Sequence, residues 1–111
     1  MKKKSPWQLQ REWEEFDEKN PHVYRLVCQY TDEVIQAGYL KFGMAAVWER
    51  VRWEIMVGTR SEHFKMPNNH RAYCARQWLD DHPEYPKFFR TAVLRSRRHV
   101  KVDRFGRPLS N

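Results

Sequence analysis

The chain has 111 residues, of which 41% are hydrophobic and 14% aromatic, so the sequence predicts one small domain and we expect no second one. It shows no apolar run of about 18 residues and no apolar segment after the basic start, so we expect neither a membrane span nor a secretion signal. The formal net charge of +7 is uneven: residues 1–86 balance 13 Lys+Arg with 13 Asp+Glu, whereas residues 87–111 carry eight cations against Asp103 alone. This asymmetry indicates an anionic partner.

The first predicted helix begins at Ser5-Pro6, because this pair followed by Gln8 forms a capping box with a favourable first proline. Its apolar residues, Leu9, Trp13 and Phe16, recur at helical spacing. Its other face carries the carboxylates Glu12, Glu14, Glu15, Asp17 and Glu18. We expect that face to be solvated, with contact to a basic partner as the alternative.

A second helix is predicted from the Asn20-Pro21 cap to a glycine stop at Gly38. Residues 39–43 are too short for an element, and we expect them to form a connector whose aromatic side chains tuck beneath neighbouring helices. Cys28 and Cys74 lie in amphipathic segments, which predicts buried, reduced thiols and a cytoplasmic protein.

The third predicted helix runs from Met44 to Val57, with Gly58 as the residue after its end. It is apolar on more than one side, which is typical of the central helix of a domain. Its main apolar face comprises Met44, Val47, Trp48, Val51 and Ile55. We therefore expect Trp48 in the core.

After a loop over residues 59–67, Asn68 or Asn69 is predicted to cap a fourth helix that ends near Asp81. One side packs through Ala72, Ala75, Trp78 and Leu79. The opposite side, expected to be open for recognition, carries Asn69, Tyr73, Arg76, Gln77 and Asp80. A short fifth helix is predicted from Pro86, with its two phenylalanines docked on the body.

Together these patterns predict an all-α fold: a compact four- to five-helix domain over residues 1–91 and a basic C-terminal tail over residues 92–111. Residues 98–103 alternate polar and apolar side chains before a turn at Phe105 to Pro108, which favours a short strand or hairpin, an extended arm, or disorder in the free tail. The third and fourth helices suggest a helix-turn-helix, although their connection exceeds the usual turn of about 3–4 residues.

Five motifs occur in a fixed order along the chain: Asn20-Pro21, Val47-Trp48-Glu49-Arg50-x-Arg52-Trp53, Phe64-Lys65-x-x-Asn68-Asn69, Tyr73-x-Ala75-Arg76 and Phe88-Phe89-Arg90. Over residues 20–96 this order resembles a family of small bacteriophage- and prophage-encoded proteins. The resemblance implies a compact helical domain in a bacterial cytoplasm. It implies no activity.

Two segments concentrate the residue types that bind nucleic acid. The first segment, a loop and helix N-terminus, supplies donors for phosphates and base edges: Lys65, Asn68, Asn69, His70, Arg71, Arg76 and Gln77. The second segment supplies cations for the backbone: Arg90, Arg95, Arg97, Arg98, Lys101, Arg104 and Arg107. The alternatives are capping and solvation for the first segment, and a solvated tail for the second.

Metal and enzyme chemistry find little support in the sequence. His70 and Cys74 are four residues apart, but no second pair completes a zinc spacing. Asp80, Asp81 and Glu84 cluster around a helix end without the strand-borne spacing of a nuclease. We therefore predict no metal, no cofactor, no small-molecule substrate and no enzymatic activity.

Two hypotheses follow. The first is a small phage-encoded DNA-binding protein, with RNA as a further ligand, whose fourth helix reads or grips the duplex while the basic tail holds its backbone. The second is a protein-binding phage accessory factor that inhibits or redirects a host machine, including anti-defence activity of the anti-CRISPR type. Neither hypothesis involves a membrane.

Overall fold

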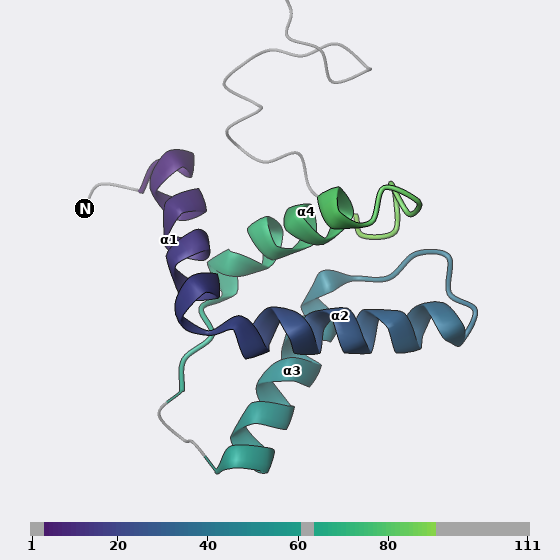
Figure 1. The fold of residues 1–111 in the computed structure, drawn as a ribbon, viewed down its shortest axis with the longest axis horizontal. Helices are drawn as coiled ribbons and strands as arrows, with labels where there is room; N and C mark the ends of the chain where they lie inside the picture. Colours follow the sequence, from purple (N-terminus) through teal and green to yellow (C-terminus); the bar gives the residue numbers. More distant parts are fainter. Residues whose placement is uncertain (1–3, 61–63, 91–111) are drawn as a thin grey trace, which may run out of the picture.

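The computed structural model describes residues 4–60 and 64–90, and in these ranges the chain is built from α-helices joined by short loops (Figure 1). The elements are α1 (Pro6–Lys19), α2 (Pro21–Gln36), α3 (Met44–Thr59), the 3₁₀ turn η1 (Asn68–His70) and α4 (Arg71–Asp81). The predicted all-α class is confirmed. The predicted tail over residues 92–111, with its strand or hairpin, lies outside the described residues.

The helices cross rather than align (Figure 1). α1 stands across the first turn of α2, because Asn20 alone separates the two helices. α3 crosses α2, and its C-terminal half projects beyond the rest of the body, while α4 begins beside α1. No helix in the described part of the chain has the length and apolar character needed to cross a membrane.

The predicted start of α1 is confirmed in detail. The Ser5 hydroxyl accepts a hydrogen bond from the Gln8 N–H (3.2 Å), and the Gln8 side chain accepts one from the Ser5 N–H (2.9 Å). This capping box satisfies two N–H groups that the helix itself cannot pair. Trp13 is buried and the face with Glu14, Glu15 and Glu18 is exposed, as expected.

The predicted cap at the start of α2 was wrong, whereas the predicted glycine stop at its end is confirmed. Asn20 does not cap α2 through its side chain: it donates from Nδ2 to the carbonyl of Phe16 (3.1 Å) and so closes the end of α1 instead. Gly38 ends α2 as predicted, with a φ of +100°. Its N–H bonds the Ile35 carbonyl and the next N–H bonds the Val34 carbonyl, which is the Schellman arrangement.

Gly58 was predicted to end α3, and this was wrong. The helix continues to Thr59, whose hydroxyl donates to the Ile55 carbonyl (2.5 Å), and Arg60 adopts the left-handed conformation that follows it (φ 55°). A side chain in that region costs roughly 1–2 kcal/mol more than glycine does. The extra turn therefore forms despite a local preference for an earlier stop.

The core is dominated by aromatic side chains, as the composition indicated. Its largest fully buried members are Trp13, Trp48, Trp78, Phe88 and Phe89. The indole rings of Trp13 and Trp48 meet edge to face with centroids 6.3 Å apart, which joins α1 to α3. The five residues of the predicted α3 face are all buried, so the central position of α3 is confirmed.

The predicted fifth helix was wrong, because residues 82–90 form consecutive turns. Pro83 and Pro86 provide no N–H for helical hydrogen bonds. Phe88 and Phe89 are nevertheless both buried, as expected, and their rings lie 5.6 and 5.1 Å from that of Trp78.

The connector between α2 and α3 is held to this last segment by its own backbone. The Phe42 N–H donates to the Phe88 carbonyl (3.0 Å), and Phe42 and Phe89 form an isolated parallel bridge. Phe42 packs against the core, whereas Tyr39 remains 56% exposed. The expectation that both aromatic residues tuck under helices was therefore right for Phe42 and wrong for Tyr39.

Both cysteines are free thiols, in keeping with the prediction. Cys74 is fully buried and Cys28 half-buried. Burial raises the pKa of both thiols, because it penalises the charged thiolate. Neither cysteine is therefore set up as a nucleophile.

Candidate functional site

The loop that precedes α4, the first predicted contact segment, is fastened to α3. The Met66 carbonyl accepts hydrogen bonds from Arg52 (2.5 Å) and from the Trp48 indole N–H (3.4 Å). Arg52 also donates to the side-chain oxygen of Asn68 (2.7 Å). Asn68 was predicted to cap α4 or contact bases, but its side chain is engaged in holding the loop. Neither Asn68 nor Asn69 caps α4 through its side chain, because the 3₁₀ turn η1 continues directly into α4.

His70 is part of the core rather than a surface donor. It is 5% exposed, and its ring centroid lies 4.8 Å from that of Phe16 and 5.8 Å from that of Trp13. Burial lowers the pKa of His70, and nearby Glu12 opposes that effect only in part. Its Nδ1 has no hydrogen-bond partner within the described ranges. An uncharged, packed imidazole does not serve as a phosphate contact.

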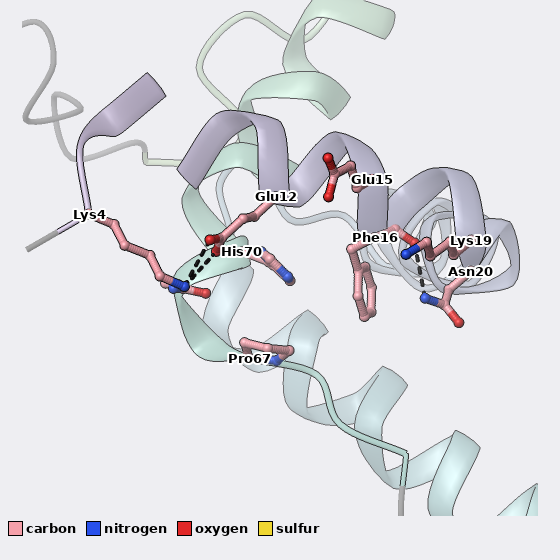
Figure 2. Close-up of a pocket in the computed structure, with 9 residues that line it drawn as sticks. Lys4, Glu12, Glu15, Phe16, Lys19, Asn20, Pro67 and His70 are labelled. Atoms are coloured by element: carbon pink, nitrogen blue, oxygen red, sulfur yellow. Dashed lines mark hydrogen bonds and ion pairs between the residues drawn. The ribbon is translucent and has the colours of Figure 1, made fainter. Parts of the chain in front are cut away.

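A pocket of about 330 Å³ lies beside η1, and its lining carries both signs of charge (Figure 2). Glu12 and Glu15 of α1 both line it, and Lys4 pairs with Glu12 at 2.8 Å. Asn69 and His70 complete its other wall. The lining balances two carboxylates with Lys4 and Lys19, so this pocket offers no net positive charge to an anionic ligand.

The side of α4 that was predicted to read DNA is largely covered by α1. Tyr73 is 7% exposed. The Gln77 carbonyl oxygen accepts from the Trp13 indole N–H (2.8 Å), and its amide donates to Asp17 (3.3 Å). The prediction of an open recognition side at Tyr73 and Gln77 was therefore wrong, because both residues join α4 to α1.

The remaining donors of this segment keep some surface. Lys65 and Asn69 are exposed, and Arg71 and Arg76 are half-buried. Arg71 donates from Nε to the Asn68 carbonyl (3.2 Å), which directs its side chain back over η1. Arg76 lines a pocket whose lining has no carboxylate, described below as the aromatic pocket.

A second pocket, of about 450 Å³, has a strongly basic lining. We call it the basic pocket, and its lining residues are Lys41, Pro86, Lys87, Phe89 and Arg90. Its three cations are exposed, and no carboxylate belongs to the lining. Lys41 comes from the α2–α3 connector and the others from the segment after α4, which the Phe42–Phe88 hydrogen bond holds together.

A third pocket, of about 400 Å³, lies between the start of α1 and the middle of α4. We call it the aromatic pocket, and its lining residues are Pro6, Trp7, Gln10, Tyr73 and Arg76. Trp7 is 79% exposed although the other aromatic wall, Tyr73, is buried. This pocket also has no carboxylate in its lining.

The outer side of α3 is apolar and faces solvent. Trp53, Met56 and Val57 are all exposed, on the half of the helix that projects from the body. The Arg50 guanidinium lies 4.5 Å from the Tyr30 ring centroid and 5.1 Å from that of Trp53. These cation–π contacts hold the Trp53 ring against the surface of α3.

The carboxylates at the end of α4 take part in packing. Tyr24 donates its hydroxyl proton to Asp81 (2.5 Å), which links α2 to the last turn of α4. Burial and this hydrogen bond both raise the pKa of Tyr24, so the phenol stays protonated. In residues 4–60 and 64–90, no three His, Cys, Asp or Glu side chains lie together in a way that could hold a metal ion.

Sequence reasoning missed two of these features. Lys41 lies far from the basic C-terminal stretch in sequence, and only the fold brings it beside Lys87 and Arg90. Trp7 was visible as a tryptophan off the apolar face of α1. Six of the predicted contacts lie outside the described residues: Arg95, Arg97, Arg98, Lys101, Arg104 and Arg107.

No protein-family model, curated protein or solved structure matches this chain. The resemblance to bacteriophage and prophage proteins therefore stays a prediction. What the molecule offers as a guide to function is the chemistry of its own surface.

Proposed function

We propose that this protein is a small, non-enzymatic, phage-encoded DNA-binding protein, and that the basic pocket holds a phosphate of the DNA backbone. The observation that carries this proposal is the meeting of Lys41, Lys87 and Arg90 around one pocket without a carboxylate. In the sequence, this pocket leads directly into the most basic part of the chain. The function resides in the bacterial host cell, where DNA is abundant.

The chemistry of the basic pocket suits a phosphate. Arginine can form two parallel hydrogen bonds to phosphate oxygens, and lysine contributes a compact point charge. Burial of Phe88 and Phe89 fixes the backbone on which Lys87 and Arg90 stand. Because that backbone is ordered before binding, less conformational entropy is lost when the phosphate arrives.

Several polar side chains of η1 and α4 are engaged within the protein and are not free to contact DNA. His70 and Gln77 are used in packing, and Asn68 holds the loop. These side chains are therefore not base readers. Arg76 is the α4 side chain that we retain in the interface, together with the basic pocket.

The test is fluorescence anisotropy of a labelled duplex, titrated with the full chain at salt concentrations from about 50 to 200 mM. Two variants carry equal charge changes, which reduce the net charge from +7 to +4. The first is Lys41→Gln, Lys87→Gln, Arg90→Gln. The matched control, at the other end of α4, is Lys19→Gln, Lys65→Gln, Arg71→Gln.

We expect the basic-pocket variant to make the log–log salt slope shallower by about 2.7, since each phosphate contact contributes about 0.9. The control should change the slope by less than about 1, because its cations lie outside the basic pocket and Lys19 shares a pocket lining with Glu12 and Glu15. Equal slopes for the two variants would show that net charge alone drives binding. Absence of binding by the wild-type chain to both a duplex and a single strand at about 50 mM salt would contradict the proposal. Circular dichroism checks that both variants fold.

A second candidate function is that of a protein-binding accessory factor that inhibits or redirects a host machine, including anti-CRISPR-type activity. It is favoured by the exposed apolar side of α3, since clustered apolar surface often marks a protein contact. The test is a pull-down from nuclease-treated host lysate with wild type and Trp53→Asp. A host protein recovered by wild type and lost with Trp53→Asp supports this function, and equal recovery contradicts it.

A further inference from the structure

We infer that the aromatic pocket takes an unpaired nucleobase, so that the preferred ligand is a single strand or an opened duplex rather than a closed one. This inference rests on the proposed function and names the ligand form within it. Bases in a closed duplex are stacked on one another and cannot present a free face to a side chain. A pocket built for a base face therefore selects unpaired nucleotides.

The first observation is the position of Trp7. It is 79% exposed, whereas Trp13, Trp48 and Trp78 are buried in the core. It stands in the first turn of α1, directly after the Ser5 capping box. The capping box orders the backbone beneath the indole, so a broad aromatic face is presented to solvent on a fixed support.

The second observation is the set of side chains that line the aromatic pocket together with Trp7. Arg76 lies in the same pocket, and a guanidinium can stack on a base or bond its phosphate. Gln10 donates one amide proton to Glu14 (2.9 Å), and its carbonyl oxygen and second N–H remain for a base edge. Tyr73 adds a second ring. A single exposed tryptophan needs no explanation, but one flanked by an arginine and an amide in a pocket fits a base.

The third observation is the size and placement of the pocket. Its volume of about 400 Å³ falls within the range of about 300–1,000 Å³ typical of small-ligand sites. In Figure 1 the start of α1 and the loop after α4 lie on the same side of α2.

The experiment measures affinity by anisotropy with three labelled probes: a single strand of about 16 nucleotides, the same strand without bases, and the closed duplex. The variants are Trp7→Ala, Trp7→Phe and, as the matched control, Trp53→Ala. Trp53 is the other exposed tryptophan and lies on α3, outside the pocket. The full chain is used throughout.

We expect Trp7→Ala to weaken binding of the single strand by roughly 5- to 150-fold, which corresponds to the loss of one base–aromatic stack. Trp7→Phe should retain most of the affinity, and Trp53→Ala should match wild type. The baseless strand and the duplex should be insensitive to Trp7→Ala, because neither offers a free base.

An unchanged single-strand affinity for Trp7→Ala would overturn the inference, and so would an equal loss on the baseless strand. If the basic-pocket variant still weakens binding in that case, the proposed function stands and only the base site fails. If wild type binds none of the three probes, the proposed function fails and the base site fails with it.

Discussion

The two ends of α4 have opposite electrostatic surroundings, although basic residues lie near both. The first end, with η1, packs against α1, which carries five carboxylates and two cations. The other end leads into residues 82–90 and the basic pocket, whose lining has three cations and no carboxylate. A cluster of donors in the sequence therefore does not by itself make an anion site. Whether donors form an anion site depends on the charge of the element that the fold places opposite them.

The two regions also differ in which side chains pack and which remain exposed to a partner. On the side of η1 and α4 that faces α1, His70 packs against α1 and Gln77 is hydrogen-bonded to it. At the other end, Phe88 and Phe89 supply the packing, and Lys87 and Arg90 are left on the surface. Lys87 and Arg90 flank the two buried rings, so one short segment both packs on the core and presents two cations to a partner.

The largest expected effect is on the free energy of unfolding, at the C-terminal end of α4. Trp78→Ala should lower the free energy of unfolding by about 3–5 kcal/mol, because it removes the ring on which Phe88 and Phe89 pack. Total stability of a domain is about 5–15 kcal/mol, so this variant should be close to unfolding. Urea denaturation followed by circular dichroism measures the change.

The control for that measurement is Trp53→Ala, which deletes an exposed indole and should change stability by no more than about 0.5 kcal/mol. If Trp78→Ala proves equally mild, the segment over residues 82–90 is not part of the core. The basic pocket would then lack the fixed support that the proposed function requires.

A smaller effect is expected for Gln77→Ala at the α1–α4 contact. The change leaves the Trp13 indole N–H without an acceptor, which costs about 1–3 kcal/mol. Thermal or urea unfolding should show this loss, while DNA affinity of the folded variant should match wild type. A loss of DNA affinity with unchanged stability would restore Gln77 to the role of a base reader.

The smallest effect is a dependence of stability on pH at the first end. Burial lowers the pKa of His70 in the folded chain, so the unfolded chain, with a pKa of about 6.5, takes up a proton more readily. The free energy of unfolding should be highest above that value and fall as the pH drops towards the lower, folded pKa. In His70→Phe, which keeps an aromatic ring against Phe16, this slope should diminish. An identical slope in both proteins would assign it to other groups.

Much of the fold could be predicted because its signals are local. The capping box at Ser5, the glycine after α2 and the apolar face of α3 each depend on residues within a few positions of one another. The fifth helix failed for the opposite reason. Phe88 and Phe89 are held by Trp78 and by the Phe42 N–H, which are distant in the sequence.

The candidate site was less predictable than the fold. Periodicity indicated one packing side on α4, but α4 is covered by α1 on another side as well, so Tyr73 and Gln77 were misplaced. Lys41 belongs to a connector with no basic neighbours in sequence. Its meeting with Lys87 and Arg90 depends on tertiary contacts that a pattern of nearby residues does not contain.

The late position of Phe88 and Phe89 has a consequence for how the protein is made. Synthesis proceeds from the N-terminus, so the four helices of the described residues have all been made before these two rings are available to cover Trp78. The core is therefore completed only after its helices have been made, and Lys87 and Arg90 reach their final positions in the same step. A nascent or shortened chain that ends before Phe88 would keep its helices but leave Trp78 uncovered, and it would present no basic pocket.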